Sequence, residues 1–137
     1  MAKGKKPTKL VEDISQAINK GLARFVVSTQ SKLSAGSPVA TGRLASSWFV
    51  GENIPNRDEA PERDEPGPVT VERFKGKIIS DNDYWISNNL PYAARAAFDP
   101  GYVGRTAAGS GAWYSEIENN LPKDMDRAMN YWLKKIK

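Results

Sequence analysis

The stretch from residue 10 to residue 38, LVEDISQAINKGLARFVVSTQSKLSAGSP, predicts a long amphipathic helix near the start of the chain. Gly21 lies inside the pattern, where it costs about 1 kcal/mol relative to Ala. Gly36 and Pro38 favour the end of the helix, because Gly is common just past a helix and Pro keeps the preceding residue out of helical angles. The three-and-four spacing of the apolar residues is typical of a helix with one face on a core. These residues are Leu10, Ile14, Ala17, Ile18, Leu22, Phe25, Val26 and Leu33.

A second amphipathic pattern closes the chain, and Pro122 within it predicts either a kink or the start of a new helix. A short helix is expected over 92–98, because Pro91 suits a helix start. Residues 38–42 are expected to form a turn and 101–111 a Gly-rich loop. Apolar residues recur at helical spacing from Trp113 onward: Ile117, Leu121, Met125, Met129, Trp132, Leu133 and Ile136.

Strand-forming residues lie between the two helical patterns. We predict strands over 45–51, 68–74, 77–80 and 84–88, with a hairpin around Gly76 joining the second and third. The order helix, strands, short helix, long helix indicates an α+β fold. We expect an antiparallel sheet of three or four strands covered by the two long helices.

The length of 137 residues suits one domain. Residues 1–9 are predicted to be a flexible basic arm, and residues 10–137 a single α+β domain. Residues 52–68 hold four prolines and many charges, which predicts a long, exposed acidic loop. No apolar run approaches the roughly 20 residues of a membrane helix, and the basic N-terminus is not followed by the apolar stretch of a signal peptide. We therefore expect no membrane contact and a protein that stays in the cytoplasm where it is made.

The chain contains no cysteine and no histidine. It therefore has no disulfide, no thiolate or imidazole metal ligand, and neither the commonest general base nor the commonest activated nucleophile. We expect a protein that is not an enzyme, with no catalytic, cofactor-binding or metal-binding residues.

Three local features of the sequence bear on catalysis or ligand binding. Asp81 and Asp83 would share one face of a strand, as a metal or acid/base pair requires, but Asn82 between them favours an ordinary turn. The Gly-rich stretch 101–111 lacks the Lys that ends a phosphate-binding P-loop. Arg43 is expected to pair with a carboxylate of its own chain or of a neighbouring copy, which is a structural role in either case.

The charges are unevenly distributed along the chain. Lysines crowd both ends, and carboxylates crowd the 52–68 loop. The simpler interpretation is a solvated tail, a solvated loop and cations that favour a helix C-terminus. The alternative is electrostatic docking, either between neighbouring copies or to nucleic acid.

Two short motifs resemble a known family. Residues 37–48, SPVATGRLASSW, resemble the "Pro-Val-x-Thr-Gly-x-Leu-x-x-Ser" run that follows an N-terminal helix in small tail-component proteins of lambda-like long-tailed phages. Residues 86–93, ISNNLPYA, resemble the "Asn-x-x-Pro-Tyr-Ala" run of the same family. The order of elements also agrees, so the likeness spans most of the chain from about Leu10.

The resemblance implies a structural virion protein in a ring at the head–tail junction: a neck, tail-completion or tail-terminator protein. The ring would hold six copies, to match a six-fold tail, or twelve, to match a portal; six is favoured. Its partners would be further copies of itself, the portal, adaptor or head-closure proteins, the tail-tube protein, and DNA passing through the lumen without sequence-specific contacts. Five residues are expected either to contact a neighbouring copy or to hold the fold together: Arg43, Trp48, Asn88, Tyr92 and Arg105.

The sequence leaves two alternative functions open. The first is a small nucleic-acid-binding module that uses the Lys-rich N-terminal arm, whose affinity would fall steeply with salt. The second is a carboxylate-dependent hydrolase built on Asp81 and Asp83.

Overall fold

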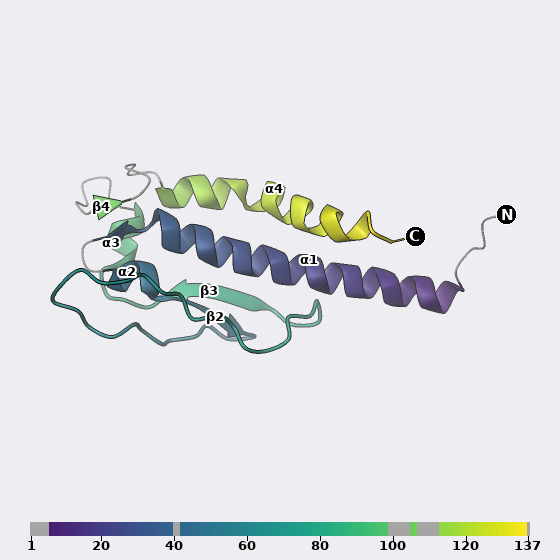
Figure 1. Cartoon of the computed structure of the whole chain (residues 1–137), viewed down its shortest axis with the longest axis horizontal. Helices are drawn as coiled ribbons and strands as arrows, with labels where there is room; N and C mark the ends of the chain where they lie inside the picture. The colour runs from purple at the N-terminus through teal and green to yellow at the C-terminus, as the bar shows by residue number, and fades with distance from the viewer. Residues whose placement is uncertain (1–5, 40–41, 99–104, 107–112, 137) are drawn as a thin grey trace.

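The computed structural model describes residues 6–39, 42–98, 105–106 and 113–136, and Figure 1 shows their arrangement. The fold contains α-helices and antiparallel strands, so the predicted α+β class is confirmed at that level. The elements in chain order are α1 (Pro7–Gly36), β1 (Pro38–Val39), α2 (Arg43–Ser46), β2 (Trp48–Glu52), β3 (Tyr84–Asn88), α3 (Ala93–Phe98), β4 (Arg105–Thr106) and α4 (Trp113–Leu133).

Helix α1 begins earlier than the sequence pattern predicted. Pro7 occupies the first turn, where its missing N–H has no helical partner in any case, so residues 7–9 belong to the helix and not to a flexible arm. Residues 1–5 of the expected arm lie outside the described part of the chain. The helix ends at Gly36, as predicted, and the Ser37 N–H donates to the Ser34 carbonyl at 3.3 Å.

Helices α1 and α4 run antiparallel, side by side, and α1 lies between α4 and the β2–β3 sheet (Figure 1). The prediction that both long helices cover the sheet was therefore wrong for α4, which packs mainly on α1. Gly21 explains the close approach: a Cβ atom there would lie 2.7 Å from Met129 Sδ and 3.0 Å from Met129 Cα. Pro122 lies inside α4 without dividing it into two helices.

Strand β2 pairs with β3 in an antiparallel ladder that places Trp48 opposite Asn88 and Glu52 opposite Tyr84. The predicted 84–88 strand is thus confirmed. Strand β2 starts later than the predicted 45–51 segment, because residues 45 and 46 end the short helix α2. Gly42, at φ 94°, supplies the left-handed residue just before α2, a conformation that favours glycine.

The predicted sheet of three or four strands is not formed by the described residues, which hold two separate two-stranded ladders. The segments 68–74 and 77–80 are not strands and form no hairpin. Side chains engage their backbone instead of a neighbouring strand: Thr70 N–H donates to Ser46 Oγ, the Glu72 carbonyl accepts from Gln30, and Ile79 N–H donates to the Tyr84 hydroxyl.

The remaining short elements complete the left end of the molecule in Figure 1. The short helix α3 starts at Ala93, one residue after its predicted start. Within the predicted 101–111 loop, residues 105–106 form β4, which pairs with β1. The rest of that loop lies outside the described residues.

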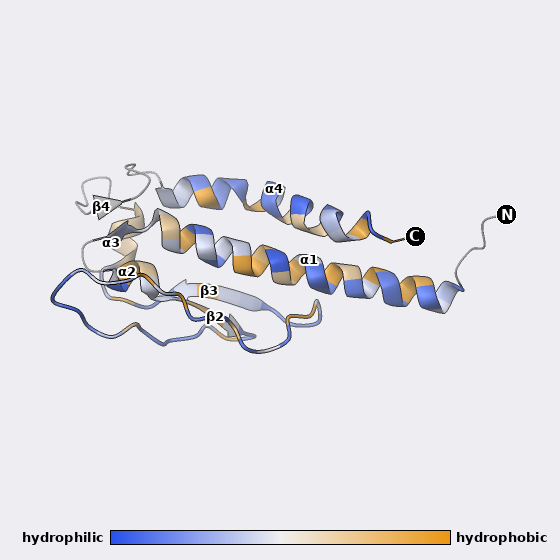
Figure 2. Ribbon diagram, viewed as in Figure 1, coloured by the Kyte–Doolittle hydropathy of each residue, from blue (hydrophilic) through white to orange (hydrophobic). Residues whose placement is uncertain are grey.

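The core sits between α1 and the inner face of β2–β3, and between the α1 C-terminal half and α4. Val26 packs with Val50 and Ile78 in one cluster, and Leu33 packs with Trp48 and Trp113 in another. Figure 2 shows the corresponding alternation of apolar and polar residues along α1. None of the helices that the structure describes is long and apolar enough to span a membrane.

Candidate functional site

The 37–48 segment forms a buried hydrogen-bond network with the end of α1. Ser37, fully buried, donates its hydroxyl to the Leu33 carbonyl at 2.6 Å and accepts from Trp48 Nε1 at 2.8 Å. Ser34 donates to the Ala45 carbonyl at 2.7 Å. Because buried polar groups are costly when unpaired, these bonds fix how the segment leaves α1 and returns as β2.

The same segment holds the acidic loop in place. Ser47, also fully buried, donates to the Arg43 carbonyl at 2.7 Å and accepts from the Ala60 N–H at 3.0 Å. Arg43 Nε donates to the Ala60 carbonyl at 2.9 Å, and its Nη2 lies 3.6 Å from Glu59 Oε1. The 52–68 loop is irregular, as predicted, but it is anchored at Ala60. Arg43 therefore pairs with a carboxylate of its own chain.

The two family-like motifs meet at Trp48 and Asn88, which face each other across the β2–β3 ladder. Asn88 Nδ2 donates to the Leu44 carbonyl at 2.8 Å, so the second motif also binds the first through a side chain. Trp48 is buried and packs edge-on against Trp113 at a centroid distance of 6.3 Å. Gln30 Nε2 donates to the Trp48 carbonyl at 2.8 Å.

Tyr92 and Arg105 are the other two residues expected to make contacts. Tyr92 is half-buried against the Leu44–Leu90–Ala96 cluster. Arg105 pairs through its backbone with Val39, and its side chain lies outside the described part of the chain. The structure thus brings together Arg43, Trp48 and Asn88.

Sequence reasoning missed the buried polar residues around them: Gln30, Ser34, Ser37, Ser46 and Ser47. The only signal for them was the density of serines near the single Trp of the motif.

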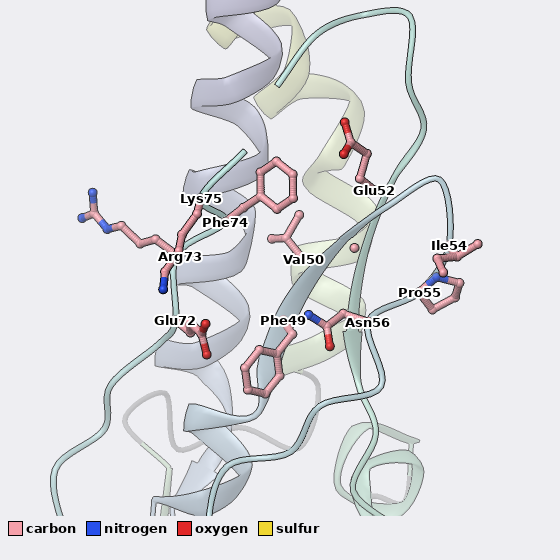
Figure 3. A pocket seen from close by; sticks show the side chains of 11 residues that line it. Phe49, Val50, Glu52, Ile54, Pro55, Asn56, Glu72, Arg73, Phe74 and Lys75 are labelled. Atoms are coloured by element: carbon pink, nitrogen blue, oxygen red, sulfur yellow. The ribbon is translucent and has the colours of Figure 1, made fainter. Parts of the chain in front are cut away.

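A pocket of about 380 Å³ lies beside β2, between residues 54–56 and 72–75 (Figure 3). Phe49, Val50 and Phe74 give it apolar walls, and charged side chains also line it.

Asp81 and Asp83, the candidate catalytic pair of the sequence, are exposed in the turn before β3, where the Asp83 N–H donates to Asn53 Oδ1. Among the described residues there is no cluster of three or more potential metal ligands.

A charged groove runs between α1 and α4, on the face of α1 that carries Arg24. Two of its hollows, of about 370 and 350 Å³, adjoin each other and share Lys32, Asp124 and Arg127. Asp124 lies 2.6 Å from Lys32 in an ion pair. A third hollow, of about 350 Å³, lies at the Lys20 end of the two helices. We call these three hollows the α1–α4 groove. Its exposed cations are Lys20, Arg24, Lys32, Lys123, Arg127 and Lys135, and its carboxylates are Asp13, Glu116 and Asp124.

Two aromatic residues of α4 lie among these cations. The Arg24 guanidinium lies 4.1 Å and Lys135 Nζ 4.3 Å from the centroid of the Tyr131 ring, and Lys20 Nζ lies 5.0 Å from that of Trp132. The Lys135 ammonium, which hydrogen-bonds the Tyr131 hydroxyl, lowers the pKa of that phenol, and Arg24 contributes in the same direction. Sequence reasoning missed this groove, although the cations recur at intervals of four and eight residues, which place them on one face of each helix and held a partial signal. They are Lys20, Arg24 and Lys32 on the first helix, and Lys123, Arg127 and Lys135 toward the end of the chain.

No family model, curated protein or solved structure matches the chain.

Proposed function

We propose that the chain is a structural virion protein of a tailed phage and forms part of the ring at the head–tail junction, as a neck, tail-completion or tail-terminator protein. The proposal starts from the resemblance of residues 37–48 and 86–93 to small tail-component proteins. It requires that the two motifs belong to one structural unit.

One observation supports the view that the two motifs belong to one structural unit. The motifs lie some 40 residues apart in the chain, yet Trp48 of the first stands opposite Asn88 of the second in the β2–β3 ladder. The Asn88 side chain also donates to the Leu44 carbonyl of the first motif. Two chance matches would not be expected to pair directly in the fold. The contact therefore supports the interpretation of the two motifs as one family-like signature.

The proposed ring contains six copies, with twelve as the portal-matched alternative. Neighbouring copies, the portal or head-closure proteins and the tail-tube protein are the proposed partners, and DNA passes through the lumen without base-specific contacts. The protein acts in the virion after synthesis in the host cytoplasm. The purified protein at low concentration is expected to be a monomer or small oligomer. The ring is expected to form only together with the neighbouring proteins of the particle, because binding between subunits depends on their concentration.

The test uses the phage or prophage whose genome encodes the chain. A stop codon early in the gene should leave DNA-filled heads and separate tails that do not join, and supplying the wild-type gene in trans should restore joined particles. Electron microscopy of these particles, with antibody labelling of the protein, checks both the defect and the position. Normal joined virions that lack the protein would contradict the proposal, as would a gene neighbourhood without portal, capsid or tail genes.

A second candidate function is a nucleic-acid-binding module that uses the N-terminal lysines. The observation in its favour is that α1 carries cations from its first turns onward, with Lys9 3.3 Å from Asp13 and with Lys20 and Arg24 further along. Because the helix begins at Pro7, deletion of residues 1–6 removes Lys3, Lys5 and Lys6 without cutting into α1. Loss of salt-dependent duplex binding in this truncation, with normal head–tail joining, would favour the second function.

A further inference from the structure

The acidic loop presents carboxylates that the fold does not use. Asp58, Glu62, Asp64 and Glu65 are exposed, and within the described part of the chain their carboxylates make no hydrogen bond or ion pair. The loop nevertheless has a defined course, because Ala60 is bound by Ser47 and Arg43, and Arg63 Nη1 donates to the Pro68 carbonyl at 2.6 Å. It is an anchored acidic surface.

The α1–α4 groove carries the opposite charge on the opposite side of the molecule. In Figure 1 the segment between β2 and β3 lies beneath the sheet, α4 lies above α1, and the sheet and α1 separate them. The groove holds six exposed cations against three carboxylates, and two of the three, Asp13 and Asp124, already pair with lysines. Because the sheet and α1 lie between the anchored loop and α4, the loop and the groove of one copy are placed to face different neighbours.

We propose that the acidic loop of one copy docks in the α1–α4 groove of the next copy. This inference rests on the ring proposed above and names the contact between its subunits. Complementary patches on opposite sides of one chain make a head-to-tail interface, and such interfaces close into rings when the rotation per subunit permits. Electrostatic complementarity fixes register and suppresses wrong partners more than it adds affinity, which suits a contact that forms only during assembly.

The mixed signs on both surfaces favour a protein occupant over nucleic acid. Glu116 and Asp124 lie in the groove among the cations, where they would repel a phosphate backbone. The loop carries the exposed Arg57 among its carboxylates, so it can match both signs. Cations of the same chain already lie over the rings of Tyr131 and Trp132, where they compete with stacking by bases.

The direct test is zero-length carboxyl–amine cross-linking of the purified full-length protein at high concentration and low salt. The sample is a mixture of unlabelled and isotopically labelled chains, so that peptides joined between copies show mixed masses. We expect mixed-mass links from Glu62, Asp64 or Glu65 to Lys20, Lys32, Lys123 or Lys135. Links only within single chains, or none between loop and groove in samples that contain rings, would overturn the inference.

Charge reversal supplies the second test. Glu62→Lys with Glu65→Lys reverses the charge at two positions of the loop, and Lys123→Glu with Arg127→Glu reverses it at two positions of the groove. Each double variant should assemble at least tenfold more weakly than wild type, since juxtaposed like charges cost several kcal/mol and 1.4 kcal/mol is tenfold. Mixed in equal amounts, the two variants should assemble again in alternation, because the new loop lysines of one variant then meet the new groove glutamates of the other. The unchanged loop meets the unchanged groove at the next contact. Lys75→Glu with Lys77→Glu is the matched control outside both surfaces and should assemble as wild type.

The outcomes separate this inference from the ring itself. Weak assembly of each variant and recovery in the mixture, by sedimentation velocity and negative-stain microscopy, support it. Unimpaired rings from either variant overturn the loop–groove contact and leave the head–tail function standing. Loss of duplex DNA binding on groove reversal, with assembly unchanged, also overturns it and assigns the groove to nucleic acid.

The head–tail function is contradicted by a different result, namely that virions lacking the protein are joined normally. Circular dichroism and thermal melts confirm that the variants fold, which their exposed positions predict.

Discussion

The 37–48 segment and the α1–α4 groove both concentrate polar side chains, but they differ in where those side chains find partners. Ser37 and Ser47 are fully buried, and each bonds within the chain as both donor and acceptor. Lys123 and Arg127 are exposed, and within the described part of the chain their cationic groups make no hydrogen bond or ion pair. A saturated buried network defines a conformation, whereas exposed, unsaturated charge is available to a partner.

Trp48→Ala should have the largest effect of any change considered, because it removes the centre of the buried network. Truncating a buried Trp costs roughly 3–5 kcal/mol, and here it also leaves the Ser37 hydroxyl without its donor and Trp113 without its ring contact. Urea denaturation measures the loss. Trp85→Ala is the matched control, since Trp85 is 49% exposed on β3 and should cost less than about 1 kcal/mol. Equal costs for the two variants would mean that the network is not the centre of the fold.

Gly21→Val should have the next largest effect on stability, and it changes the packing of α4 on α1, the two helices that form the groove. The new side chain would meet Met129 Sδ at 2.7 Å and the Ala128 carbonyl at 3.2 Å, so the two helices must separate. Overpacking of this kind costs roughly 1–3 kcal/mol by thermal or chemical denaturation. Ala35→Val, at an exposed position of α1, reports the helix-propensity cost alone. A Gly21→Val protein as stable as the control would show that α4 is not tightly packed on α1.

Ser47→Ala should cost less, about 1–2 kcal/mol, because it deletes one hydroxyl but leaves the Ala60 N–H without its acceptor. Its informative effect is on the acidic loop, which loses one of its two bonds at Ala60. Trypsin should then cleave after Arg57 or Arg63 faster than in wild type, at matched folded fraction. Ser80→Ala, at an exposed position, should leave the cleavage rate unchanged. If Ser47→Ala does not accelerate cleavage, the loop is held by contacts other than the network.

The sequence predicted those features whose signal lies within one element. Helical spacing identified α1 and α4, Pro91 indicated the start of α3, and strand-forming residues identified β3. It failed for residues 68–74, which have strand composition but bond through their backbone to Ser46 and Gln30, and those partners lie far away in the chain. A strand needs a neighbour, and composition cannot say whether a side chain will take that place.

The candidate surfaces divide in the same way. Arg43, Trp48 and Asn88 were singled out from their motifs, and all three do make structural contacts. The serines around them were missed, because a serine gives no sign in sequence of whether it is buried. The groove was missed because its two rims come from α1 and α4, some hundred residues apart, and only their antiparallel packing joins the two rows of cations.

The smallest expected effect concerns Tyr131, whose phenol reports the field of the groove. Hydrogen bonding and charge from Lys135, with a further contribution from Arg24, lower its pKa below the ordinary value of 10.0, while burial, followed by Glu118, raises the pKa of Tyr114. The folded state favours the phenolate of Tyr131. This group therefore stabilises the fold only as the pH rises through its lowered pKa toward 10, and the contribution is lost as the pH falls below that pKa.

Titration of tyrosinate absorbance in wild type, compared with that in Tyr131→Phe, isolates the ionisation of this group. Lys135→Gln should raise the Tyr131 pKa, and added salt should raise it in wild type, because screening weakens exposed charges. If the Tyr131 pKa stays the same in Lys135→Gln and in high salt, the groove carries less positive potential than its six cations suggest, and the case for an acidic occupant would weaken with it.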